Sequence, residues 1–197
     1  ISALYMPATN EIQPQPLGVV GIMVPWNYPL FLAVGPMIDA LTAGNRIMIK
    51  MSEAAPQFAK AFSDVIARYF SPDMVCVVLG EVDIAEAFSK LPFDHLLYTG
   101  STAIGKKVMA AAAPNLTPVT LELGGKSPVI VLEGANLEAA VNRVMMGKTL
   151  NAGQTCIAPD YVLVQRKDHE SFIRLAKEWM TKHYPNIIDN PDNSRNI

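Results

Sequence analysis

The sequence has little cysteine and little charge, and both shortages narrow the classes of function open to it. Its 197 residues include two cysteines, Cys76 and Cys156, which lie far apart and outside any Cys-x-x-Cys spacing. This pattern argues against a disulfide framework and against a zinc site, so we expect no metal centre. Charged residues make up 17%, the net charge is −2, and lysines and arginines form no cluster. Nucleic-acid binding therefore has little electrostatic support.

Long apolar runs and an N-terminal targeting signal are also missing. No apolar stretch reaches the roughly 20 uninterrupted residues that a membrane-spanning helix needs. The longest candidate, residues 29–43, contains Pro36 and Asp39. The start at Ile1 lacks a methionine and a basic segment. We therefore expect no signal peptide, a sequence cut from a longer chain, and a cytoplasmic protein whose reducing surroundings keep a thiol usable.

The sequence is rich in apolar residues, arranged in alternating strand and helix patterns. Half of the residues are hydrophobic, which suits a large core and argues against disorder. Strands are predicted at residues 19–24, 46–50, 74–79, 95–98, 119–123, 128–132 and 161–165. Helices are predicted at residues 30–43, 55–70, 84–91, 102–113, 137–150 and 169–183. The alternation predicts an α/β fold with an open, mainly parallel, Rossmann-like sheet and helices on both faces.

Four short segments that carry polar side chains come directly after predicted strands. They are residues 25–27, 50–53, 99–101 and 122–125. In open α/β sheets, ligands bind beyond the carboxyl ends of the strands. We therefore expect these segments to lie along one edge of the sheet and to belong to one site.

Two of these segments have features of a dinucleotide site. Gly100, Ser101 and Gly105 lie where a strand becomes a helix, and the N–H groups and dipole of a helix start suit a pyrophosphate. The two glycines are five positions apart and do not form the Gly-x-Gly-x-x-Gly fingerprint, so a plain serine-capped helix is the alternative. Lys50 and Glu53 follow the second strand, where a carboxylate can hold ribose hydroxyls and repel a 2′-phosphate, favouring NAD over NADP. A solvated charge pair at a helix start is the alternative there.

Three further side chains have the chemistry of acyl transfer. Asn27 lies in a proline-flanked loop, where its amide either donates to a developing oxyanion or satisfies a turn. Glu122 alternates with two leucines before a Gly-Gly pair and is either a general base or an exposed strand residue. Cys156 lies at a helix-to-strand junction after a glycine and is either a nucleophile or a structural thiol. We expect Cys76, inside a run of valines, to be a core residue.

Five segments together resemble the aldehyde dehydrogenase superfamily in order and approximate spacing. They are Pro-Trp-Asn-Tyr-Pro at 25–29, Lys-Met-Ser-Glu at 50–53, Tyr-Thr-Gly-Ser-Thr at 98–102, Leu-Glu-Leu-Gly-Gly-Lys-Ser-Pro at 121–128 and Gly-Gln-Thr-Cys at 153–156. Each is weak or moderate alone, whereas five in register are specific. The sequence at residues 116–121 and 156–161 is most similar to the class 3-like branch, and within it to bacterial coniferyl aldehyde dehydrogenases.

The resemblance implies a role for each candidate residue. Cys156 would attack an aldehyde and form a thiohemiacetal and then a thioester, Asn27 would stabilise the oxyanion, and Glu122 would activate the hydrolytic water. The product would be a carboxylic acid, NAD would be the expected cofactor, and NADP would be the alternative. The implied cofactor-binding residues are Trp26, Lys50, Glu53, Gly100, Ser101 and Gly105.

The resemblance also implies how the chain is divided. Residues 1–150 would form a dinucleotide-binding domain, with 1–15 in an oligomerisation hairpin, and residues 151–197 would begin a truncated catalytic domain. Members of the family are more than twice as long and include later segments for the nicotinamide ribose and for dimerisation, so a homodimer is expected of the full-length protein. Two alternatives stay open: a non-catalytic dinucleotide-binding module, and an acylating enzyme in which CoA or phosphate takes the acyl group.

Overall fold

The computed structural model describes residue 7 and residues 11–185, and the chain divides into two compact units. Unit 1 is Ile1–Glu122 and unit 2 is Leu123–Ile197. Most of the expected hairpin over residues 1–15, and the tail beyond residue 185, fall outside the described residues. The predicted boundary between 150 and 151 concerns the roles of the two parts and stays a prediction.

Unit 1 is built on a five-stranded sheet with the order β3-β2-β1-β4-β5. The strands are β1 (Val19–Met23), β2 (Arg46–Lys50), β3 (Val75–Val78), β4 (His95–Gly100) and β5 (Val119–Leu123). β1 pairs in parallel with both β2 and β4, and β2 pairs in parallel with β3. The chain builds outward from β1 to β3 and then returns to place β4 on the other side of β1. The direction of winding therefore reverses between β1 and β4, which is where open α/β sheets leave a crevice for ligands.

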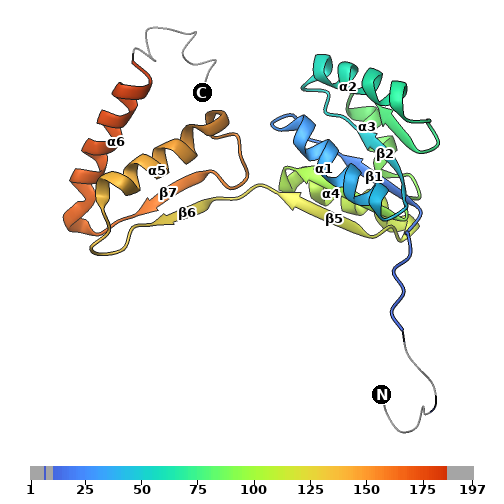
Figure 1. Cartoon of the computed structure of the whole chain (residues 1–197), viewed down its shortest axis with the longest axis horizontal. Coiled ribbons are helices and arrows are strands. Elements are labelled where there is room, and N and C mark those ends of the chain that lie inside the picture. The colour runs from blue at the N-terminus through green and yellow to red at the C-terminus, as the bar shows by residue number, and fades with distance from the viewer. Residues whose placement is uncertain (1–6, 8–10, 186–197) are drawn as a thin grey trace. The chain divides into compact units, whose positions relative to one another are not determined.

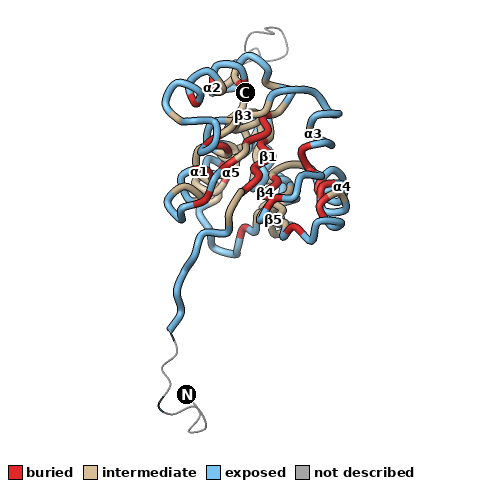
Figure 2. The backbone as a smooth tube through the Cα atoms, turned by 90° about the vertical axis from the view of Figure 1, so that its right-hand side faces the viewer, coloured by how far each residue is buried: buried red, intermediate tan, exposed pale blue. Residues whose placement is uncertain are grey.

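Helices cover both faces of this sheet, as predicted. Figure 2 shows α1 and α2 on one side of the strands and α3 and α4 on the other. Their bounds are α1 (Pro29–Thr42), α2 (Pro56–Tyr69), α3 (Val82–Ser89) and α4 (Thr102–Ala112), and a short 3₁₀ turn, η2 (Ala113–Asn115), follows α4. Strand and helix alternate along the chain, which confirms the predicted α/β class.

The ends of these helices follow the local chemistry of the sequence, with one exception. Proline occupies the first position of α1 and of α2, where its missing N–H costs no hydrogen bond. Gly44 follows α1 with φ +86°, as expected of a glycine after a helix end. Ser52, a residue type that often caps helices, does not cap α2. Ala55 is the cap instead, and the Ser52 hydroxyl accepts a hydrogen bond from the N–H of Ala54 at 3.2 Å.

The core of unit 1 lies between the central strands and the helices, where Figure 2 shows buried backbone along β1 and β4. Ile22, Ile47, Ile49 and Leu96 are almost wholly buried. Burial of a side chain of this size contributes about 1.5–3 kcal/mol. The expectation that Cys76 is a core residue is wrong: the thiol is only partly buried, because β3 is the edge strand of the sheet.

Unit 2 contains a parallel strand pair with two long helices on it. Its elements are β6 (Ser127–Ile130), α5 (Leu137–Thr149), η3 (Leu150–Gly153), β7 (Pro159–Leu163), η4 (Arg166–Asp168) and α6 (His169–His183). Figure 1 shows α5 and α6 on the same side of β6 and β7, and their small core is built around Val131, Val141 and Phe172. Asn136 caps α5 by accepting a hydrogen bond from the N–H of Ala139 at 3.0 Å. β7 begins two residues earlier than predicted.

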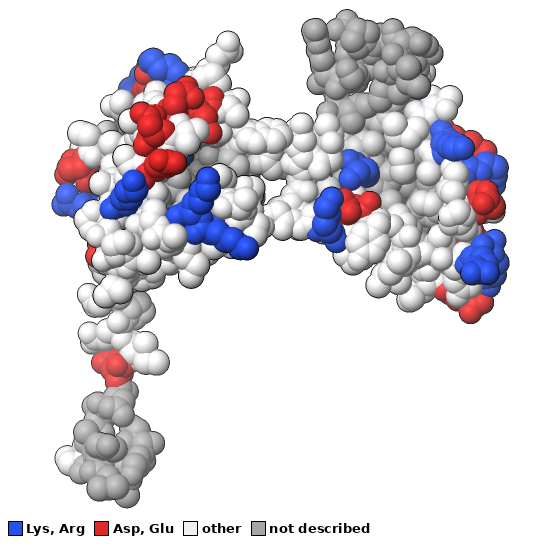
Figure 3. Space-filling model, turned by 180° about the vertical axis from the view of Figure 1, so that it is seen from behind, with Lys and Arg blue, Asp and Glu red and all other residues white. Residues whose placement is uncertain are grey.

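Neither a membrane-spanning helix nor a metal-binding cluster is found among the described residues. No helix among them combines the length and the apolar character needed to cross a membrane. Within the same residues, no group of three or more histidine, cysteine, aspartate or glutamate side chains is arranged to hold a metal ion. Acidic and basic side chains both occur on the face of unit 1 seen in Figure 3, in keeping with the small net charge.

Candidate functional site

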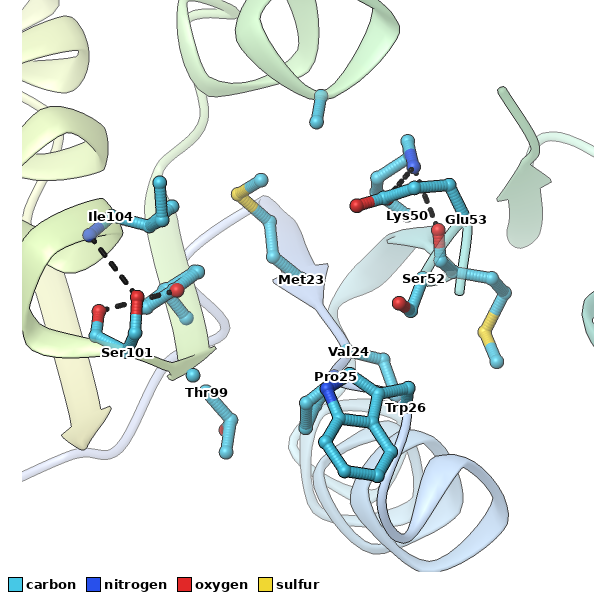
Figure 4. A pocket seen from close by; sticks show the side chains of 14 residues that line it. Met23, Val24, Pro25, Trp26, Lys50, Ser52, Glu53, Thr99, Ser101 and Ile104 are labelled. Atoms are coloured by element: carbon cyan, nitrogen blue, oxygen red, sulfur yellow. Dashed lines mark hydrogen bonds and ion pairs between the residues drawn. The ribbon is translucent and has the colours of Figure 1, made fainter. Parts of the chain in front are cut away.

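A cavity of about 240 Å³ lies in unit 1 at the carboxyl ends of β1, β2 and β4. Three of the four predicted segments meet there, and Figure 4 shows them arranged around the end of β1. The lining residues are Met23, Val24, Pro25, Trp26, Lys50, Met51, Ser52, Glu53, Ala85, Tyr98, Thr99, Gly100, Ser101 and Ile104. The fourth segment, residues 122–125, contributes none of them. The cavity therefore occupies the crevice that the strand order creates.

Lys50 is the most unusual side chain of this cavity, because it is a buried cation. The residue is 2% exposed, and its ammonium donates a hydrogen bond of 2.7 Å to the carbonyl of Met51. Its Nζ also lies 3.5 Å from a carboxylate oxygen of Glu53, whose side chain is 37% exposed. The alternative of a fully solvated charge pair is therefore wrong for Lys50. A buried ammonium is costly unless it is paired, and here it keeps donor capacity next to open space.

The opposite wall of the cavity is the start of α4. Ser101 caps this helix, because its hydroxyl accepts a hydrogen bond from the N–H of Ile104 at 3.4 Å. Gly100 precedes it and has no room for a side chain, since an added carbon would overlap the ring and hydroxyl of Tyr98. The N–H groups of a helix start favour an anion. Gly105 is buried in α4 and is not among the lining residues, so its cofactor role stays a prediction.

Tyr98 lines the cavity, although sequence reasoning gave it no role. It is 7% exposed, and its hydroxyl donates a hydrogen bond of 3.3 Å to the carbonyl of Ser101. Burial raises the pKa of the Tyr98 hydroxyl above its ordinary value, because the charged phenolate loses hydration. The available signal was the alternation in β4, which buries Leu96 and Tyr98 while His95 and Leu97 are more exposed.

The loop after β1 carries Trp26 and Asn27. Trp26 lines the cavity with about half of its surface exposed, so its ring is accessible to a ligand. Asn27 is partly buried in the bend before α1 and does not line the cavity. The structure therefore places the tryptophan at the cavity, while the oxyanion role of Asn27 stays a prediction.

Glu122 is exposed near the end of β5. The flanking residues Leu121 and Leu123 are partly buried, so the predicted alternation of this strand is confirmed. Glu122 closes unit 1, and the Gly124–Gly125 pair belongs to unit 2. An exposed carboxylate is accessible to water, as a general base for hydrolysis requires.

Cys156 is exposed in unit 2, on a tight turn between η3 and β7. The turn is closed by a hydrogen bond of 3.0 Å from the N–H of Ala158 to the carbonyl of Thr155. Just before it, Asn151, Ala152 and Gly153 all have left-handed backbone conformations. The thiol is thus accessible, as a nucleophile requires. That Asn27, Glu122 and Cys156 share one site stays a prediction.

Comparison with known proteins decides the family. The model of the aldehyde dehydrogenase family matches residues 3–193, almost the whole chain. The chain belongs to the aldehyde dehydrogenase family. It is 58% identical over 188 residues to a probable coniferyl aldehyde dehydrogenase of Pseudomonas aeruginosa, a match that covers 95% of this chain and 40% of that relative. It is 46% identical over 187 residues to aldehyde dehydrogenase family 3 member A2 of Pongo abelii, with 94% of this chain and 39% of the relative covered.

Solved structures of the family have the same fold. An aldehyde dehydrogenase of Mycobacterium tuberculosis in complex with NAD⁺ matches with a TM-score of 0.79 and 38% identity, over 84% of this chain and 35% of that one. The Rossmann-like class and the class 3-like resemblance are therefore confirmed. The chain spans about 40% of the length of the curated relatives named above.

Proposed function

We propose that this chain is the cofactor-binding and nucleophile-bearing part of an NAD-dependent aldehyde dehydrogenase, which oxidises an aldehyde to a carboxylic acid. The observation that carries the proposal is the cavity at the reversal of the sheet, where a buried lysine faces a helix start. Lys50 and Glu53 form one wall and Ser101 begins the other. In folds of this class, dinucleotides bind at this place.

The residues of the cavity fit a nicotinamide dinucleotide. The Lys50 ammonium and the Glu53 carboxylate would hold the adenosine ribose hydroxyls, as donor and acceptor. The N–H groups at the start of α4, next to Gly100 and Ser101, would hold the pyrophosphate. Trp26 would contact the cofactor with its exposed face. The negative charge of the carboxylate at position 53 disfavours a 2′-phosphate, so we propose NAD over NADP. When bound, the cofactor supplies the hydride acceptor.

The acyl chemistry would belong to three side chains. The Cys156 thiolate attacks the carbonyl carbon, and the resulting alkoxide is stabilised by the amide of Asn27. A single oxyanion donor of this kind is worth about 3–4 kcal/mol of barrier. After oxidation, the acyl group is a thioester on Cys156. Glu122 then accepts a proton from water, which attacks the thioester, frees the thiolate and releases the acid.

The relatives suggest the substrate class. Because the chain is 58% identical to a probable coniferyl aldehyde dehydrogenase, we propose an aldehyde conjugated to an aromatic ring as substrate. A homodimer of the full-length protein and a cytoplasmic location are proposed on the family resemblance alone. An acylating reaction, in which CoA or phosphate takes the acyl group, is less favoured, because Glu122 provides a base for water.

The proposal is tested with Cys156→Ala in the complete protein. The variant should lose reduction of NAD by cinnamyl-type and aliphatic aldehydes, while the Kd for NAD changes by no more than about twofold, because Cys156 does not line the cofactor cavity. Cys76→Ala is the matched control and should keep full activity. An active Cys156→Ala enzyme would remove the nucleophile assignment. Turnover that requires added CoA or phosphate would replace hydrolysis by acyl transfer.

A further inference from the structure

The turn that carries Cys156 lies directly against Gly125, the second glycine of the Gly-Gly pair after β5. A side-chain carbon built at Gly125 would lie 3.1 Å from the carbonyl oxygen of Cys156. This distance is shorter than ordinary van der Waals contact between carbon and oxygen, so either the turn or the glycine would have to move. At Gly124, the same construction meets nothing within 4 Å. The two glycines therefore differ in their relation to the thiol.

An ion pair joins the same two segments. Lys126 Nζ lies 3.1 Å from a carboxylate oxygen of Asp160, across a separation of 34 residues in sequence. The Asp160 side chain is only about one-third exposed, so its position is partly fixed by its surroundings. An exposed pair of this kind contributes about 0.2–1 kcal/mol, enough to bias a loop and too little to hold a fold.

The strand register gives Asp160 its place in this pair. Ser127 pairs with Pro159, and Pro128 pairs with Tyr161, so the β6–β7 ladder passes over Asp160. Such an irregularity redirects the side chain of the extra residue. Three features of unit 2 thus lie at or next to the Cys156 turn: Gly125 with no side chain, the Lys126–Asp160 ion pair, and the irregular register between β6 and β7.

We propose that Gly125 is a positioning residue for the Cys156 nucleophile. Because Gly125 has no side chain, the Cys156 turn packs closely against the Gly-Gly segment, and the Lys126–Asp160 ion pair stabilises this contact. This proposal rests on the proposed role of Cys156. A need for a left-handed backbone does not explain the glycine at position 125, because neither Gly124 nor Gly125 has a positive φ. Alanine is therefore sterically acceptable to the local backbone at both positions, and the difference between them is the carbonyl of Cys156.

The test compares Gly125→Ala with Gly124→Ala by the rate at which iodoacetamide alkylates Cys156. Tryptic peptides 149–166 and 69–90 separate Cys156 from Cys76, so mass spectrometry follows both thiols in one sample. Gly125→Ala should change the alkylation rate constant of Cys156 by about 3- to 10-fold. The added carbon displaces the turn by a few tenths of an ångström, whereas a displacement of 1 Å costs about 100-fold in a positioned reaction. Gly124→Ala should change it by less than about twofold, and Cys76 should not respond in either variant.

Positioning is distinguished from loss of structure by two further measurements. In the complete protein, Gly125→Ala should lower kcat by about 3- to 10-fold with little change in the Kd for NAD. Should Gly125→Ala fail to fold, Lys126→Met tests the same contact between the two segments: it should change the alkylation rate constant of Cys156, and Lys126→Arg should restore that rate constant. Equal Cys156 rates in the two glycine variants, or an unchanged Cys156 rate in Lys126→Met, would overturn the proposal. Alkylation reads the thiol without turnover, so it answers even if aldehyde oxidation is absent.

Discussion

Replacement of the buried Lys50 by methionine should separate cofactor binding from stability. The Lys50 ammonium makes one hydrogen bond, of 2.7 Å, to the Met51 carbonyl, and it lies 3.5 Å from the Glu53 carboxylate. Methionine has similar volume and removes a charge that is expensive to bury. The remaining Glu53 is about one-third exposed, so water solvates its charge. We therefore expect the free energy of unfolding to change by no more than about 1 kcal/mol.

The same substitution should weaken NAD binding strongly. A hydrogen bond from an ammonium to a ribose hydroxyl is worth about 1.5–3 kcal/mol, which corresponds to a Kd about 10- to 150-fold higher. Calorimetric titration with NAD and urea unfolding measure the two quantities. Lys60→Met is the matched control, because Lys60 lies exposed on α2 beside Asp64, and it should alter neither. An unchanged Kd in Lys50→Met, or a loss of stability above about 3 kcal/mol, would refute this reasoning.

Three further substitutions test other parts of the structure. Glu53→Gln should improve NADP binding relative to NAD by about tenfold, because it removes a charge that repels the 2′-phosphate; an unchanged ratio of Kd values would contradict this. Because the pKa of Tyr98 is raised in the folded protein, the unfolded chain loses the phenolic proton at lower pH than the folded protein does, and the free energy of unfolding falls as pH rises above 10.0. Urea unfolding between pH 9 and 11 should show a smaller decrease in the Tyr98→Phe variant. Ala152→Gly should raise the free energy of unfolding by about 0.5 kcal/mol, because removal of the steric strain of an alanine in the left-handed conformation outweighs the entropy cost of glycine. A lower melting temperature of the variant would count against this prediction.

Local signals in the sequence were enough for the elements of the sheet and for much of the cavity. Residues 119–123 and 169–183 have the predicted bounds, and Ser101 begins α4 where the glycine-rich turn indicated. These features depend on neighbouring residues, such as hydrophobic alternation and capping side chains, so a pattern is sufficient to find them. The meeting of three post-strand segments followed from one further rule, the placement of ligands at the carboxyl ends of parallel strands.

Features that depend on strand order or on distant pairing could not be read in this way. Cys76 lies in an apolar run that is typical of a central strand, and only the strand order shows that β3 is at the edge. Ser52 resembles a cap, but Pro56 sets the start of α2 and the serine bonds within its own turn. The approach of Gly125 to the Cys156 turn depends on the register of β6 and β7, which are separated by 28 residues (131–158).

The central claim is that the Cys156 sulfur becomes covalently acylated by the aldehyde. The most direct measurement uses the complete protein as Glu122→Gln, in which hydrolysis of the thioester should be slow, mixed with NAD and cinnamaldehyde and quenched in acid. Mass spectrometry of the tryptic digest should show the cinnamoyl mass on peptide 149–166 and none on peptide 69–90. An acyl group on the Cys76 peptide, or steady oxidation of the aldehyde with no acyl group on Cys156, would contradict the account.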